Sequence, residues 1–392
     1  MNFSYYIPTK ILFGPGKLND LATEELPGKK ALIVISAGNS MRKNGYLDRV
    51  TGILEGRGIP YVLFDKILPN PVKSHVMEGA ALAKKEGCDF IIGLGGGSSI
   101  DSAKSIAVMA KNSGDYWDYV GGGSGKGMPV PNGALPVVAI TTTAGTGTEA
   151  DPWTVITKED TNEKIGFGNA DTFPVLSVVD PELMLSVPPH LTAYQGFDAL
   201  FHSTEGFIAS VATPVSDAFA LKSIELIAKY LPACVKDGNN LEARTQVALA
   251  NTLAGMVEST SSCTSEHSME HALSAHHHDL PHGAGLIMLS EAYFTFFARK
   301  VPQRLIAMAK AMGVDTDLLP ENERPISFVK ALVKLQKDCG VDKLKMSDFD
   351  IKKEDIPMLA ENARHTMGGL FAVDPYSLSL EETIEIMTKA YK

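Results

Sequence analysis

The hydrophobic pattern in the first half of the chain predicts buried strands that alternate with helices. Short apolar runs rich in β-branched residues, each bounded by Gly, Pro or polar residues, occupy positions 29–36, 59–66, 89–96 and 135–142. Such runs are typical of parallel strands that are buried on both faces. Helical patterns separate them, for example at 45–56 and 72–86. This alternation predicts βαβ units, right-handed crossovers and a parallel sheet with helices on both faces.

The pattern changes after Asp180 and Pro181, and the rest of the chain shows mainly helical periodicity. We expect helices at 190–211, 214–230, 240–276, 284–296, 300–312, 325–339 and 379–391. Ser379 begins a capping box, which marks a helix start. At 392 residues the chain is long enough for two domains. We therefore predict a Rossmann-like α/β dinucleotide-binding domain at 1–183 and an all-α C-terminal metal-binding domain at 184–392.

The third apolar run leads through a glycine-rich turn directly into a helix. The turn consists of Gly95, Gly96, Gly97 and Ser98. Glycines let the backbone approach a bulky anion, and the helix N-terminus adds unpaired N–H groups and a positive dipole end. Asp101 and Lys104 lie in the first turns of that helix, with Lys104 able to reach a phosphate. We expect a pyrophosphate site here, although a tight turn without a ligand needs similar glycines.

Hydroxyl side chains follow the fourth apolar run, in the sequence TTTAGTGTEAD at 141–151. Polar loops at the carboxyl ends of parallel strands are where an α/β sheet binds its ligand. Thr141 and Thr142 are therefore expected to line the same cofactor site as the glycine-rich turn. A threonine-rich turn without a ligand is the alternative.

The loop after the first apolar run bears on the choice of cofactor. In many dinucleotide sites an acidic residue after a strand binds the ribose hydroxyl and repels a 2′-phosphate. Here the loop contains Ser36, Gly38, Asn39 and Ser40. It has no carboxylate, and the cations Arg42 and Lys43 follow it. This composition favours NADP(H) over NAD(H).

Histidines are concentrated in one short stretch of the second half. Six of the ten lie between Glu266 and Gly283, at positions 267, 271, 276, 277, 278 and 282. Imidazole is the commonest metal ligand in proteins. His267 and His271 are four residues apart and share a helix face, whereas Pro281 predicts a turn at His282. A metal site is expected, but it needs further ligands.

Asp198 and His202 supply suitable ligands, because residues four apart on a helix project together. With His267 and His282 they make a set of one carboxylate and three imidazoles that suits Fe²⁺ or Zn²⁺. The alternative is an ordinary hydrogen bond between Asp198 and His202 on a helix surface. The consecutive histidines 276–278 fit a polar loop.

Charge and cysteine content exclude several classes of protein. The formal net charge is −10, which disfavours binding to nucleic acid and to anionic membranes. Four widely spaced cysteines without a CxxC motif indicate reduced thiols rather than disulfides or a zinc ribbon. No signal-peptide pattern opens the sequence, and we expect a cytoplasmic protein.

Taken together, four motifs resemble those of the iron-containing (group III) alcohol dehydrogenase family. They are GGGSSIDSAK (95–104), TTTAGTGTE (141–149), DPELMLSVPPHLTAYQGFDALFHSTEG (180–206) and HSMEHALSAHHHDLPHG (267–283). The resemblance covers nearly the whole chain and implies metal ligation by Asp198, His202, His267 and His282. It also implies a proton-relay role for His271 near the reacting carbon, and it places Lys164 near the cofactor.

The resulting expectation is a metal-dependent alcohol dehydrogenase and aldehyde reductase, a homodimer that uses NADP(H) and short-chain primary alcohols or aldehydes. Fe²⁺ is the expected metal, with Zn²⁺ and NAD(H) as alternatives. Two other functions remain open. One is a polyol dehydrogenase or a dehydroquinate synthase-like enzyme on the same fold, and the other is a metal-binding protein without catalysis.

Overall fold

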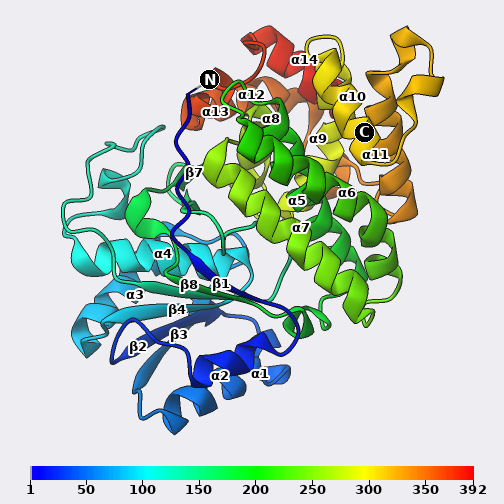
Figure 1. Ribbon diagram of the computed structural model, residues 1–392. Coiled ribbons are helices and arrows are strands. Elements are labelled where there is room, and N and C mark those ends of the chain that lie inside the picture. The colour runs from blue at the N-terminus through cyan, green and yellow to red at the C-terminus, as the bar shows by residue number, and fades with distance from the viewer. Residues whose placement is uncertain (1) are drawn as a thin grey trace. The chain divides into compact units, whose positions relative to one another are not determined.

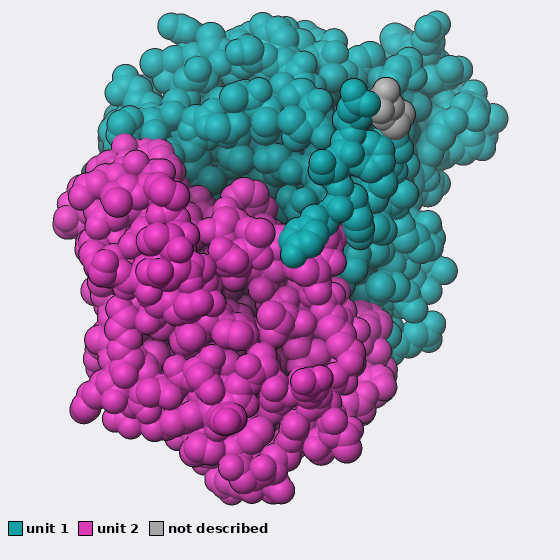
Figure 2. Space-filling model, turned by 60° about the vertical axis from the view of Figure 1, so that its left-hand side comes forward, with its two compact units in different colours: residues 1–6, 187–392 teal, residues 7–186 magenta. Residues whose placement is uncertain are grey.

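A computed structural model describes residues 2–392 of the chain, which form two compact units (Figure 2). One unit comprises residues 7–186 and the other residues 187–392 together with the segment that ends at Tyr6. None of the helices in the described part of the chain is both long and apolar enough to cross a membrane.

The unit at 7–186 is built on a six-stranded, fully parallel sheet in the order β1-β8-β5-β4-β2-β3 (Figure 1). The strands are β1 (Lys10–Phe13), β2 (Ala31–Ser36), β3 (Tyr61–Ile67), β4 (Phe90–Gly95), β5 (Val137–Thr141) and β8 (Leu176–Val179). The predicted α/β sheet and its four apolar strands are confirmed as β2, β3, β4 and β5. The sequence pattern does not predict β1 and β8, because four residues are too few to show a periodicity.

Helices and one hairpin complete this unit. They are α1 (Ser40–Lys43), α2 (Tyr46–Gly56), α3 (Lys73–Glu86), α4 (Gly97–Lys111) and the antiparallel strands β6 (Thr154–Lys158) and β7 (Glu163–Phe167). Helices α2, α3 and α4 supply the expected crossovers between parallel strands. The β6–β7 hairpin lies outside the parallel sheet and is not predicted from the sequence.

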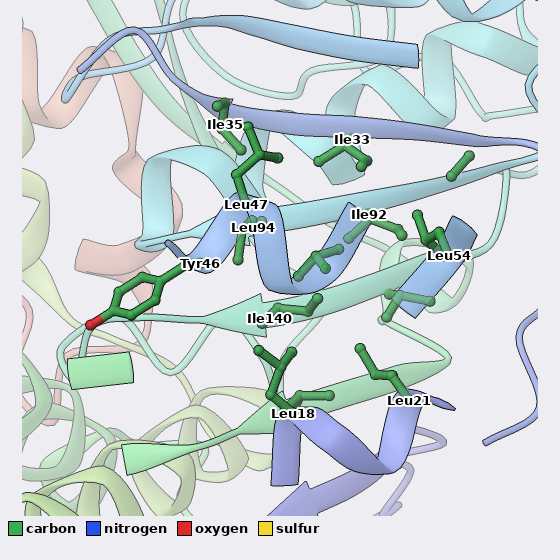
Figure 3. Packing of buried hydrophobic residues seen from close by; sticks show 14 of the residues in the cluster. Leu18, Leu21, Ile33, Ile35, Tyr46, Leu47, Leu54, Ile92, Leu94 and Ile140 are labelled. Carbon is green, nitrogen blue, oxygen red and sulfur yellow. The ribbon is translucent and has the colours of Figure 1, made fainter. Parts of the chain in front are cut away.

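A continuous apolar core fills one face of the parallel sheet (Figure 3). Ile33 and Ile35 of β2 pack there with Leu47 and Leu54 of α2. Val34 lies between the two isoleucines in sequence, so it points to the opposite face, and it is fully buried as well. Burial on both faces explains the unbroken apolar run, since each buried aliphatic side chain contributes roughly 1.5–3 kcal/mol.

The chain reverses its direction across the sheet between β2 and β4. From β2 it continues outward to β3 at the edge, whereas from β4 it continues to β5 on the other side. The loops that follow β2 and β4 therefore leave toward opposite sides at a topological switch point. Open α/β sheets bind their ligands in the crevice at the carboxyl ends of the strands at this point.

A phosphate contact would require the Lys104 ammonium to point to the carboxyl ends of the strands. In the structure the ammonium is buried among protein oxygens instead. The side chain is fully buried, and its Nζ donates to four protein oxygens at 2.7–3.1 Å. These belong to Thr148, Asp151 and Trp153. An ammonium has only three hydrogens, so none is left for a phosphate. Lys104 instead ties α4 to the loop between β5 and β6.

Asp101 belongs to the same buried network and also turns away from the glycine-rich turn. Its carboxylate accepts hydrogen bonds from Thr148 Oγ1 at 2.7 Å and from the Val155 backbone N–H at 2.9 Å. Burial raises the pKa of this carboxyl to about 6, against the opposing effect of Lys104. Asp101 and Lys104 therefore position the threonine loop, although both lie in the motif that suggested a cofactor contact.

The unit at 187–392 is helical, as predicted. Its α-helices are α5 (Pro189–Ile208), α6 (Pro214–Lys236), α7 (Leu241–Thr260), α8 (Ser265–His276), α9 (His282–Phe297), α10 (Pro302–Ala311), α11 (Ile326–Asp338), α12 (Ile356–Thr366), α13 (Gly368–Ala372) and α14 (Leu380–Ala390). The capping box predicted at Ser379 is present, with Glu382 as its partner. Helices α12 and α13 are not predicted from the sequence.

Two sequence expectations in this unit are wrong. The single helix expected at 240–276 is two helices, α7 and α8, because the backbone leaves the helical conformation at Ser261. Small polar residues favour such breaks because they bind nearby backbone groups. Here Ser261 Oγ donates to the Gly206 carbonyl, and Glu205 accepts from the Thr264 N–H at 2.8 Å. The second error is His282, which opens helix α9 instead of lying in a turn.

We predict that Lys104→Met strongly destabilises the unit at 7–186. Removing the ammonium leaves the buried Asp151 carboxylate without its countercharge, a loss that costs about 3–5 kcal/mol. Urea unfolding followed by circular dichroism measures the effect. Lys111→Met is the matched control, since Lys111 is exposed in the last turn of the same helix and its loss should cost less than about 0.5 kcal/mol. Equal stability of the two variants would refute the structural role.

Candidate metal centre and cofactor loops

Helix α5 carries three polar residues on one buried face. Asp198, His202 and Glu205 follow one another at intervals of four and three residues, which places them on adjacent turns. Each is no more than 5% exposed. An ordinary surface hydrogen bond, the alternative reading of Asp198 and His202, is therefore wrong.

The structure brings Asp198 together with three histidines. Its Oδ1 lies 3.7 Å from Nε2 of His202, 3.6 Å from Nε2 of His267 and 3.5 Å from Nε2 of His282. The four ligand atoms all lie within 4.8 Å of one another. A tetrahedral ion with bonds of roughly 2.0–2.2 Å has ligand–ligand edges of about 3.3–3.6 Å. The spacing therefore fits one divalent cation.

Two atoms at the middle of this cluster lack an ordinary partner. Asp198 Oδ1 and His267 Nε2 are buried, and neither has a hydrogen-bond partner among residues 2–392. Buried polar atoms are rarely left in this state unless an ion or water satisfies them. The donor set and these two atoms fit a bound metal.

The histidines also determine the charge of Asp198. Burial raises the pKa of this carboxyl, but the three surrounding imidazoles outweigh burial and hold the pKa at about 2. For His267 burial lowers the pKa, whereas Cys263 and Glu205 raise it well above its usual value. Metal ligation requires the neutral imidazole, so metal binding at His267 competes with its protonation.

Two glutamates bind the histidine rings at Nδ1, on the side away from Asp198. Neither of them is predicted from the sequence. Nδ1 of His267 is hydrogen-bonded to Glu205, and Nδ1 of His282 to Glu270. Carboxylate–histidine pairs of this kind fix the tautomer and the orientation of a metal-binding ring. Each partner lies on the preceding helix of the site: Glu205 of α5 supports α8, and Glu270 of α8 supports α9.

Two glycines allow the start of α9 to approach the neighbouring helices. A Cβ at Gly283 would lie 2.1 Å from the carbonyl oxygen of Tyr194 in α5. A Cβ at Gly285 would lie 2.7 Å from Cγ of Glu270. The glycines therefore let His282 reach the cluster and leave room for the glutamate that orients it.

The other histidines of the stretch differ from the four that converge. His271 is buried on α8, with its ring centroid 5.3 Å from that of His282, and its Nδ1 faces Met367 Sδ at 2.8 Å. It lies beside the cluster without belonging to the four-residue set. His276 ends α8 and His277 follows it, so these residues lie at the far end of the helix from His267.

In the unit at 7–186, the three loops predicted to bind the cofactor lie at one edge of the sheet. They follow the neighbouring parallel strands β2, β4 and β5. The Thr142 N–H donates to the Gly95 carbonyl at 2.9 Å, which joins the threonine loop to the glycine-rich turn. Thr141 is buried, and its hydroxyl donates to the Thr143 carbonyl at 2.9 Å.

The glycine-rich turn opens α4 without a side-chain cap. A helix start of this kind leaves backbone N–H groups for an anion. The glycines also have an internal role, since a Cβ at Gly97 would lie 2.4 Å from Cγ2 of Thr146. Close packing of the turn against the threonine loop thus requires glycine whether or not a ligand is present. The Ser98 hydroxyl donates to the Pro69 carbonyl.

Lys164 and the loop after β2 complete the predicted cofactor residues. Lys164, on β7, is buried and donates to Asn70 Oδ1 at 3.3 Å, next to the segment that Ser98 contacts. After β2, Asn39 precedes the short helix α1, which starts at Ser40. The nearby Arg42 forms an exposed ion pair with Asp65 at 2.6 Å, so one of the expected cations already has a partner.

Comparisons with known proteins agree with this architecture. The model of the iron-containing alcohol dehydrogenases matches residues 8–181, and that of the C-terminal domain of the Fe-containing alcohol dehydrogenase family matches residues 192–391. Alcohol dehydrogenase 4 of Saccharomyces cerevisiae is 34% identical over 99% of this chain and 98% of its own length. The NAD-dependent methanol dehydrogenase of Bacillus methanolicus is 34% identical, over 92% and 93% respectively.

The solved structure of an archaeal alcohol dehydrogenase from a Red Sea brine pool superposes with a TM-score of 0.95 at 34% identity. The match covers 100% of this chain and 99% of that one. An α/β unit, a helical unit and a buried Asp-His₃ cluster define a metal-dependent oxidoreductase. The chain belongs to the iron-containing alcohol dehydrogenase family and is an alcohol dehydrogenase.

We predict that Glu270→Gln lowers metal affinity by about 10- to 100-fold, because the amide no longer fixes and polarises the His282 ring. Calorimetric titration of the metal-free protein with Fe²⁺ under anaerobic conditions measures the change. Glu361→Gln, at an exposed position on α12, is the matched control and should bind like the unaltered protein. Unchanged affinity in Glu270→Gln would exclude the supporting role.

Proposed function

We propose that this enzyme oxidises short-chain primary alcohols with NADP⁺ and reduces the corresponding aldehydes with NADPH. The observation that carries the proposal is the convergence of Asp198 with three imidazoles at one point, with two buried atoms left unsatisfied. The unit at 7–186 adds loops at the switch point of a parallel sheet, where proteins of this class bind dinucleotides. A metal-sequestering protein without catalysis has no need of the second feature.

The metal-binding residues are Asp198, His202, His267 and His282. A divalent cation held there supplies Lewis-acid polarisation of the substrate oxygen. Asp198 contributes the negative charge of the set, while Glu205 and Glu270 hold the His267 and His282 rings in place. We favour Fe²⁺ over Zn²⁺ because of the family to which the chain belongs, although both ions accept this donor set.

His271 is the proposed group for proton transfer. It is buried beside His282, and imidazole is the usual proton carrier near neutral pH. Since it lies outside the four-residue set, we assign its ring to exchange of the hydroxyl proton. The remaining contribution of the protein is orientation of the reactants.

The cofactor preference rests on the loop after β2. Ser36 ends the strand at the position where an acidic residue would repel a 2′-phosphate, and Asn39 and Ser40 offer polar groups. Lys43 remains as a nearby exposed cation after Arg42 pairs with Asp65. The methanol dehydrogenase of Bacillus methanolicus is named as NAD-dependent. We therefore expect this chain to differ from that relative in its cofactor preference.

The alternative function is oxidation of a small polyol on the same fold. Both readings use the same metal set and differ in the substrate, so a panel of primary alcohols, diols and aldehydes separates them. A homodimer remains our prediction for the oligomeric state.

We predict that His282→Ala loses bound metal and at least about 100-fold in kcat/KM for alcohol oxidation, since it leaves a three-ligand site. Elemental analysis of the anaerobically purified protein and steady-state kinetics measure the two effects. His278→Ala is the matched control because His278 is exposed and outside the four-residue set. Full metal content and activity in His282→Ala would overturn the ligand assignment.

We predict that kcat/KM is higher with NADP⁺ than with NAD⁺, and that Ser36→Asp reverses the preference. A carboxylate at the end of β2 would repel the 2′-phosphate and bind the ribose hydroxyl, a change of about tenfold or more in the ratio. Ser113→Asp adds the same charge at an exposed position beyond the other end of α4 and should leave the ratio unchanged. A clear preference for NAD⁺ in the unaltered enzyme would defeat this reading of Ser36.

A further inference from the structure

A second group of potential metal ligands adjoins the four-residue cluster and shares only His202 with it. The group consists of His202, Glu258 and Cys263, whose ligand atoms lie within 4.8 Å of one another. The Cys263 thiol donates to Glu258 Oε1 at 3.0 Å, and the same oxygen lies 3.2 Å from His202 Nε2. Each residue comes from a different segment: α5, the end of α7, and the break between α7 and α8.

The position of Glu258 differs from that of the other two glutamates. Glu205 and Glu270 contact Nδ1 of their histidines, on the side away from Asp198. Glu258 contacts Nε2 of His202, the nitrogen that faces Asp198. It therefore lies on the ligand side of the ring, where an ion would lie, and not behind it.

The break between α7 and α8 puts the thiol at this point. An unbroken helix over 240–276 would place Cys263 five residues beyond Glu258, about 140° around the helix axis. Because the helix ends at Thr260 and restarts at Ser265, the thiol turns back to the Glu258 carboxylate. Burial raises the pKa of this thiol well above its usual value, and His267 beside it acts in the opposite direction.

We propose that His202, Glu258 and Cys263 form a second cation position, which takes a thiophilic divalent ion such as Zn²⁺ or Cd²⁺ and competes with the four-residue site for His202. A nitrogen, an oxygen and a sulfur donor form a softer set than one carboxylate and three imidazoles, and sulfur favours Zn²⁺ over Fe²⁺. The 3.2 Å between His202 Nε2 and Glu258 Oε1 is close to the nitrogen–oxygen edge of about 3.4 Å in a tetrahedral zinc site. The 3.0 Å between Cys263 Sγ and Glu258 Oε1 is shorter than the sulfur–oxygen edge of about 3.6 Å, so the thiol must move outward to bind an ion.

The competition follows from chemistry alone. One imidazole nitrogen binds one ion at a time, so an ion at the second position removes His202 from the first. Asp198, His267 and His282 then remain as an incomplete set. Excess zinc is thus expected to weaken the binding of iron without displacing it from all of its ligands.

Cobalt(II) titration of the metal-free, full-length protein tests the proposal under anaerobic conditions. Thiolate coordination gives Co²⁺ an intense charge-transfer absorption in the near ultraviolet, which a site with only oxygen and nitrogen ligands lacks. We expect this absorption in the unaltered protein and its loss in Cys263→Ser. Cys339→Ser, at the end of α11, is the matched control and should keep it.

Two further variants separate the two positions. His282→Ala removes a ligand of the four-residue site alone, so it should retain the charge-transfer absorption, whereas His202→Ala should lose it. Glu258→Gln keeps the thiol and should weaken cobalt binding at the second position by about tenfold or more, which provides a test if Cys263→Ser does not fold. No absorption, or one that survives Cys263→Ser, would overturn the proposal.

The functional counterpart is inhibition by zinc of the iron-loaded enzyme. Cys263→Ser should raise the zinc concentration for half-inhibition by about tenfold or more, relative to Cys339→Ser. Because the cobalt spectrum does not depend on turnover, it reports on the second position even if the proposed alcohol dehydrogenase reaction fails. Equal inhibition of Cys263→Ser and Cys339→Ser would show that zinc inhibits without the second position and would contradict the proposed competition.

Discussion

The helical unit depends on the buried contact of the Asp198 carboxylate with three imidazoles. A carboxylate out of water is costly unless positive charge compensates it, and here the compensation comes from ring nitrogens at 3.5–3.7 Å. The rings come from α5, α8 and α9, so these helices must meet at one point. Positions 283 and 285 must be glycine because the start of α9 packs closely against α5 and Glu270. This close packing brings His282 to the cluster.

In the unit at 7–186, buried polar contacts hold the loops at the carboxyl edge of the sheet in place. Its rigidity comes from charge buried behind the loops. Lys104 and Asp101 fasten the threonine loop, and that loop packs against the glycine-rich turn. Asp101 and Lys104 of the GGGSSIDSAK motif therefore stabilise these loops from within the unit.

How much the sequence predicts depends on how local each signal is. The apolar runs of β2, β3, β4 and β5 and the four-residue spacing of Asp198 and His202 are local patterns, and the structure confirms the strands and brings the two side chains together. The four-residue strands β1 and β8 and the break at Ser261 are set by tertiary partners, so periodicity does not reveal them. The direction of the Lys104 side chain is equally non-local, since its partners lie 44–49 residues away.

The supporting glutamates show most clearly why local spacing misleads. His202 and Glu205 are three apart on α5, as are His267 and Glu270 on α8, and this spacing suggests a pair within each helix. In the structure each glutamate instead holds the histidine of the next helix. Two hydrogen bonds thereby link α5 to α8 and α8 to α9. A displacement of α5 or α8 therefore disturbs a histidine on the next helix, so the packing of these helices and the geometry of the Asp-His₃ cluster depend on each other.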